Sequence, residues 1–111
     1  MDISKRSAGG VTVVSLAGDL DSQSAPEAQQ RLVELIPEDG RFLIDLGGVP
    51  YMSSAGLRAM LLVHRRAQAL NSAMALSGMS RELVSVMSAT GFLEFFTVSD
   101  TVDSGIEVLR P

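Results

Sequence analysis

Cysteine and tryptophan are absent from this 111-residue chain, and histidine and tyrosine occur once each. The lack of cysteine excludes disulfides, thiol catalysis and thiolate metal sites. Because His64 is the only histidine, a metal site built from several histidines is excluded as well. We therefore expect neither a metal nor a cofactor.

Positive charge is scarce and scattered along the chain. Nine Lys and Arg residues stand against thirteen Asp and Glu residues, which gives a net charge of −4. Affinity for nucleic acid comes from clustered Lys and Arg, so we expect no nucleic-acid partner. The densest basic group, formed by Arg58, Arg65 and Arg66, is interpreted as the solvated face of a helix.

Long apolar runs are missing too. None is long enough to span a bilayer, and the first ten residues, MDISKRSAGG, lack the apolar core of a secretory signal. We expect no membrane insertion and a cytoplasmic location, unless the chain is part of a larger protein. Its 46% hydrophobic and 20% charged residues are typical of a globular protein. At this length we expect one domain over residues 1–111.

Short apolar, β-branched runs alternate with helical segments. Strands are predicted within residues 10–21, 41–46, 73–78 and 95–99, and helices within 22–40, 55–70, 80–91 and 99–110. The segment DISKRS can pair with the first strand as a hairpin. This order predicts an α/β fold with a mixed, largely parallel sheet. The inner face of the second helix is expected to contain Leu57, Met60, Leu61, His64 and Ala67.

Polar residues stand at most of the predicted helix starts. Ser24 is predicted to cap the first helix in a capping box with Glu27. Ser80 is predicted to cap the third helix, and Ser99 or Asp100 the fourth.

The stretch YMSSAGL, residues 51–57, places two adjacent serines at the start of the second helix. His64 lies ten residues beyond Ser54, about 15 Å along a helix, which is too far for a Ser–His catalytic pair. Asp19 and Asp21 could form an acid/base pair or a cation site, but a polar turn is the favoured interpretation. No enzyme emerges. Ser53 and Ser54 are interpreted as helix caps, at a helix end that can accommodate a phosphate.

Three segments and the α/β order carry a resemblance to a known family. The segments are VVSLAGDLDSQSA, LIDLGGVPYMSSAGL and LSGMSRELVSVMSATGF. Across nearly the whole chain, they resemble the STAS-domain anti-sigma factor antagonists, also called anti-anti-sigma factors. The resemblance implies the STAS fold, with a four- to five-stranded mixed, largely parallel sheet and about four helices packed mainly on one face.

The resemblance also implies a partner switch. The unphosphorylated protein binds an anti-sigma factor serine kinase and releases the sigma factor. Phosphorylation on Ser54 prevents this binding, and a PP2C-type phosphatase reverses it. Asp21 matches the family aspartate beside the phosphoserine. Ser53 stands where the family usually has Asp, and Ala55 where it has Ser or Thr, so Ser53 is the alternate acceptor.

The hypothesis places partner contacts at the first polar loop, the start of the second helix and the turn before the third. In helical projection, Arg58 and Leu62 share the exposed side of Ser54. The predicted partner surface comprises Asp21, Ser22, Ser53, Ser54, Ala55, Gly56, Arg58, Leu62, Gly78, Met79 and Ser80. The protein is expected to be a monomer in isolation. Two alternatives stay open: a partner switch that controls secretion, motility or biofilm, and a non-switching STAS ligand-binding or scaffold subunit of a transport complex.

Overall fold

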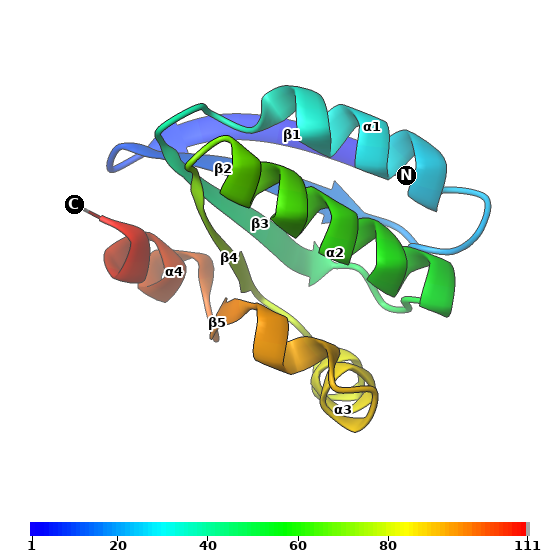
Figure 1. The fold of residues 1–111 in the computed structure, drawn as a ribbon. Coiled ribbons are helices and arrows are strands. Elements are labelled where there is room, and N and C mark those ends of the chain that lie inside the picture. Colours follow the sequence, from blue (N-terminus) through cyan, green and yellow to red (C-terminus); the bar gives the residue numbers. More distant parts are fainter. Residues whose placement is uncertain (111) are drawn as a thin grey trace.

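Five strands form one sheet in the order β1-β2-β3-β4-β5 in the computed structural model, which describes residues 1–110 (Figure 1). The strands are β1 (Asp2–Ala8), β2 (Val11–Ala17), β3 (Arg41–Gly48), β4 (Ala73–Ser77) and β5 (Thr97–Ser99). β1 pairs antiparallel with β2, and every other pair is parallel. The predicted mixed, largely parallel sheet with an opening hairpin is therefore confirmed.

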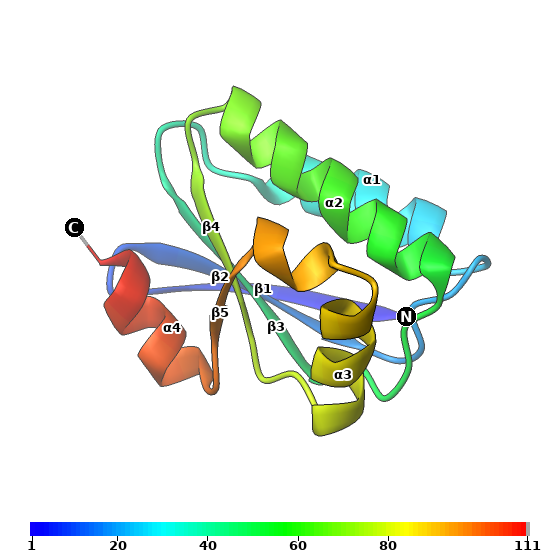
Figure 2. The same ribbon diagram turned by 60° about the horizontal axis from the view of Figure 1, so that its bottom comes forward.

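Helices cover the two faces of the sheet unequally. They are α1 (Ala25–Leu35), α2 (Ser54–Ala69), α3 (Arg81–Ala89) and α4 (Val102–Leu109). The first three pack on one face and α4 lies on the other (Figures 1 and 2). This arrangement confirms the expected α/β fold with helices mainly on one face. Among the described residues, no helix has both the length and the apolar character needed to cross a membrane.

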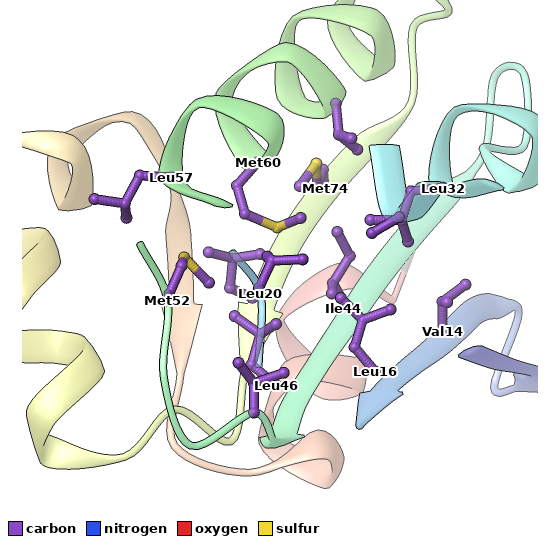
Figure 3. Packing of buried hydrophobic residues seen from close by; sticks show 14 of the residues in the cluster. Val14, Leu16, Leu20, Leu32, Ile44, Leu46, Met52, Leu57, Met60 and Met74 are labelled. Atoms are coloured by element: carbon purple, nitrogen blue, oxygen red, sulfur yellow. The ribbon is translucent and has the colours of Figure 1, made fainter. Parts of the chain in front are cut away.

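The larger core lies between the sheet and the three-helix face. Val14 and Leu16 of β2 and Ile44 of β3 point into it, opposite Met60 of α2 (Figure 3). Successive strand residues point to opposite faces of the sheet. The strand residues that point to the other face therefore form a second cluster, under α4. This smaller cluster contains Val11, Val13, Leu43, Ala75 and Leu109. Burial on both faces explains why β2 and β3 are apolar almost throughout.

The buried face of α2 differs from the predicted one. Leu61 and His64 are only half-buried, whereas Ala59 and Val63 are buried in their place. The helix is therefore rotated about its axis relative to the expected orientation. The remaining predicted inward residues are buried: Leu57, Met60 and Ala67.

The last two helices begin with capping side chains. The Ser80 hydroxyl accepts a hydrogen bond of 3.1 Å from an amide in the first turn of α3, as predicted. The prediction for α4 is wrong, because Thr101 caps it in a reciprocal capping box with Ser104. Ser99 belongs to β5 and Asp100 lies in the bend that follows, so both precede the cap position.

Candidate partner-binding site

Backbone hydrogen bonds join the loop after β2 to the connection before α2. The Leu20 amide donates to the Tyr51 carbonyl oxygen at 2.9 Å, and the Ser53 amide donates to the Leu20 carbonyl oxygen at 2.9 Å. Leu20 and Met52 thereby form a parallel bridge. The residues that follow Leu20 are consequently held beside the start of α2.

Gly56 allows α2 to begin directly against this loop. A Cβ on Gly56 would lie 2.5 Å from the Leu20 carbonyl oxygen and 2.7 Å from Cγ of Met52. Real Cβ contacts are not this short, and one of the two facing atoms belongs to backbone. The glycine in SSAGL therefore has a packing role that does not depend on any phosphorylation.

The two adjacent serines have different environments. Ser53 is the N-cap residue of α2, but its side chain makes no capping hydrogen bond. Its Oγ is buried and has no hydrogen-bond partner among the described residues. Ser54 is the first residue of α2 and is exposed. Ser53 thus occupies the predicted cap position without capping, and the accessible hydroxyl of the pair belongs to Ser54.

Asp21 organises the loop that leads into α1. Its Oδ1 accepts hydrogen bonds from the amides of Ser24 at 3.1 Å and Gln23 at 3.0 Å. These backbone hydrogen bonds, that of Ser24 foremost, hold the pKa of Asp21 below its ordinary value. The Ser24 hydroxyl donates to the Asp19 carbonyl oxygen at 2.7 Å and makes no capping bond in α1, so the predicted box with Glu27 does not form.

A hollow of about 540 Å³, the α1–α2 hollow, lies between the starts of the two helices, which run side by side in Figure 1. Its polar lining comes from Ser22, Gln29, Ser54 and Arg58, and its apolar lining from three alanines and Pro26. Arg58 is the only charged residue in the lining. The hollow brings together four predicted site residues: Ser22, Ser54, Ala55 and Arg58.

Leu62 and the residues from α1 extend this part of the site. Leu62 follows Arg58 on α2 and is 37% exposed, in agreement with the predicted exposed side of the helix. The sequence did not single out Pro26 or Gln29 as site residues. Their signal was weak, because only the packing of α1 beside α2 shows which residues of α1 face the hollow.

The turn at Gly78–Ser80 forms a second part of the predicted surface, at the end of β4. Gly78 has φ +74°, and a Cβ there would lie 2.9 Å from Oδ1 of Asp45. Asp45 accepts hydrogen bonds from the Ser15 hydroxyl at 3.0 Å and the Gly47 amide at 2.9 Å. Asp45 is a neighbour of this turn that was not predicted, although its position as an acid inside an apolar strand is a signal in the sequence.

His64, the one imidazole of the chain, lies against an aromatic ring and not against the serine pair. His64 packs edge-to-face against Phe96, with ring centroids 5.2 Å apart, and partial burial lowers its pKa. It makes no hydrogen bond to Ser54 within the described part of the chain, so Ser54 lacks a general base there. In residues 1–110, no three His, Cys, Asp or Glu side chains converge in a metal-binding arrangement.

Comparison with known proteins agrees with this architecture. The family model described as the STAS domain matches residues 2–105. BtrV of Bordetella bronchiseptica, named as a candidate anti-sigma factor antagonist, is 28% identical over 102 residues, which are 91% of this chain and 88% of BtrV. The anti-sigma-B factor antagonist of Bacillus subtilis is 27% identical over 94 residues, which are 85% of this chain and 86% of the relative.

Solved structures share the fold. An anti-sigma factor antagonist from Mycobacterium paratuberculosis superposes with a TM-score of 0.88 at 21% identity, over 99% of this chain and 94% of its own. SpoIIAA, a Bacillus cell fate determinant solved in the phosphorylated form, superposes with a TM-score of 0.70 at 17% identity. That match covers 98% of this chain and all of SpoIIAA. At these identities the likeness shows the STAS-like fold alone.

Proposed function

The chain belongs to the STAS domain family, and on that premise we propose that it is a phosphorylation-controlled partner-switch protein. In its unphosphorylated form, it binds an anti-sigma factor serine kinase in the cytoplasm and the kinase releases its sigma factor. The kinase transfers the γ-phosphoryl group of ATP to Oγ of Ser54, the hydroxyl proton is lost and ADP leaves. The phosphorylated form no longer binds, and a PP2C-type phosphatase reverses the modification.

The different exposure of the two serines carries this proposal. A kinase must bring the acceptor hydroxyl in line with the γ-phosphate of ATP. Ser54 is exposed at the edge of the α1–α2 hollow, whereas Oγ of Ser53 is buried. This difference favours Ser54 as the acceptor over Ser53. The phosphorylated form of SpoIIAA, a protein with the same fold, is consistent with such a modification.

The surroundings of Ser54 suit a partner surface. The first turns of α2 line the hollow, the Asp21 loop contributes Ser22 to it, and the exposed Leu62 side chain lies one turn beyond Arg58. We assign the Gly78–Ser80 turn to the same surface, because it lies at the same end of the parallel strands (Figure 2). A phosphate adds about −1.5 to −2 charges. Burying that charge against a partner without new cations costs several kcal/mol, which corresponds to a large loss of affinity.

Mass spectrometry tests the acceptor. The protein is incubated with ATP and an anti-sigma factor serine kinase from the same organism, and Ser53→Ala serves as the matched control for Ser54→Ala. Wild type and Ser53→Ala should each gain one phosphate, and Ser54→Ala none. A phosphate that is lost in Ser53→Ala but kept in Ser54→Ala would assign the acceptor to Ser53. No phosphate on the wild type would contradict the switch and favour a scaffold role.

Pull-down with the same kinase tests the switch itself. Ser54→Ala should retain the kinase in the presence of ATP, because it cannot acquire the phosphate. Ser54→Asp should bind poorly, because it places a permanent negative charge on the proposed surface. Binding of Ser54→Asp as tight as that of the wild type would rule out a charge-based switch at this residue.

A further inference from the structure

Arg58 and Ser54 open onto the same hollow from successive turns of one helix. Residues four apart on a helix are neighbours, with Cβ atoms about 5–6 Å apart. Helical side chains also lean toward the N-terminus of their helix, which directs the Arg58 side chain toward the Ser54 hydroxyl. Both residues line the α1–α2 hollow, and both are exposed.

The charge of Arg58 is not neutralised by any side chain in the described structure. Within residues 1–110, the one ion pair joins Arg110 and Glu107, near the C-terminus. The first turn of α2 contains no acidic residue. The nearby loop carboxylate, Asp21, already accepts the amides of Gln23 and Ser24. The hollow therefore contains one cation and no anion.

We propose that Arg58 is the intramolecular counter-ion of a phosphate on Ser54, an inference that rests on the proposed phosphorylation of that residue. Guanidinium groups bind phosphate through paired N–H donors in a planar fork. A phosphate on Ser54 would also lie near the amides of the first turn of α2, which have no acceptor inside the helix. The hollow, at about 540 Å³, has room for the phosphate and the guanidinium together.

This pairing changes what phosphorylation does to the surface. In the unphosphorylated protein, the Arg58 guanidinium is exposed at the hollow and available to an acidic group of the partner. In the phosphorylated protein, the same guanidinium is held by the phosphate, and the pair fills the space between α1 and α2. Phosphorylation thus adds negative charge, withdraws a cation and closes the hollow in one event.

A phosphorus NMR titration tests the pairing without any kinase. Phosphoserine is incorporated at position 54 during translation, in the wild type and in Arg58→Gln, Arg58→Lys and Arg65→Gln. A neighbouring cation favours the dianion, so the second phosphate pKa, ordinarily near 6, should rise by roughly half a unit in Arg58→Gln. Arg58→Lys should restore part of the difference. Arg65→Gln removes an exposed α2 cation outside the lining and should leave the value unchanged.

Two results would overturn the inference. One is an equal phosphate pKa in the wild type and Arg58→Gln. The other is an equal rise in Arg65→Gln, which would indicate only the general field of the helix surface. As a second measurement, the Arg58 Nε–H resonance should shift when Ser54 carries the phosphate. Because the phosphoserine is built in, the failure of any kinase to modify Ser54 would overturn the proposed function and leave this measurement intact.

Discussion

Gly56 packs so closely against Leu20 that a Cβ on the glycine would lie 2.5 Å from the Leu20 carbonyl oxygen. The same oxygen accepts the amide of Ser53 at 2.9 Å. The start of α2 and the loop after β2 are therefore one packed unit. A substitution that displaces Leu20 should therefore also displace Ser53 and Ser54. The stability of the contact between this loop and α2 and the position of the Ser54 hydroxyl are consequently linked.

Gly56→Ala should destabilise the protein by about 1–3 kcal/mol, the usual cost of overpacking a tight contact. Gly105→Ala is the matched control, because Gly105 is also helical and the atoms nearest to its added Cβ belong to the Leu43 side chain, the closest being a Cδ methyl at 2.9 Å. There the gain in helix propensity, about 1 kcal/mol, offsets part of the clash. Urea unfolding measures both variants. Equal losses would mean that the Leu20 backbone contact has no special cost.

Ser53→Ala should leave stability unchanged or raise it by up to about 1 kcal/mol, because the buried Oγ of Ser53 has no partner. Ser80→Ala, at another N-cap, should cost about 1 kcal/mol, because the Ser80 hydroxyl accepts the Leu83 amide. Thermal and urea unfolding of the two variants give the comparison. A loss in Ser53→Ala as large as that in Ser80→Ala would show that Ser53 caps α2 in solution.

Strands and helix caps were predicted correctly where the residues next to one another in the sequence determine them. The short apolar runs of β2 and β3 indicated strands, and Ser80 was identified as a cap from its own neighbours. The α4 cap was misplaced from Thr101 to Ser99 or Asp100 because the extent of β5 decides which polar residue stands at the helix start. That extent depends on pairing with β4 and is not a local property.

The site was less predictable than the fold, because its key distinctions arise from packing between distant segments. The sequence places Ser53 and Ser54 side by side, and only the contact with Leu20 separates a buried hydroxyl from an exposed one. The inward positions predicted for Leu61 and His64 were wrong for a similar reason: the rotation of α2 about its axis follows from its contact with the sheet. Arg58 and Leu62, which are outward in helical projection, were placed correctly.

Asp21→Asn should reduce the loss of folding stability that occurs as the pH falls into the acid range. The pKa of Asp21 is lower in the folded protein than in the unfolded chain, where Asp has a value of about 4. Its contribution is therefore complete above that value and is lost as pH falls through the folded pKa. Unfolding midpoints between pH 2 and 6 should drop less steeply in Asp21→Asn than in the wild type. A slope in Asp21→Asn as steep as that of the wild type would contradict the expectation.

His64 should make the protein less stable as the pH falls below neutrality. Partial burial lowers the folded pKa of His64 below its ordinary value near 6.5. Between the folded pKa and 6.5, the unfolded chain binds more protons, so stability decreases as pH falls through this window. His64→Phe removes the titration and keeps a ring against Phe96. The wild type should lose more stability between pH 7 and 5 than His64→Phe, and parallel curves would contradict the expectation.

Gly78→Ala should disturb the turn that we assign to the partner surface. Gly78 and Gly91 both have positive φ, +74° and +80°, so an alanine at either pays backbone strain of about 1–2 kcal/mol. A Cβ at Gly91 meets nothing within 4 Å, whereas one at Gly78 would lie 2.9 Å from Oδ1 of Asp45 and 3.1 Å from the Gly47 amide nitrogen. Gly78→Ala should therefore be the less stable variant in urea.

The same pair of variants tests whether the turn contacts the kinase. The extra contact with Asp45 should displace Gly78–Ser80, so Gly78→Ala should retain less kinase in pull-down than Gly91→Ala at a temperature where both are folded. The comparison isolates the turn, because the backbone strain is common to both variants. Equal retention with unequal stability would place the turn outside the contact and confine binding to the Asp21 loop and α2.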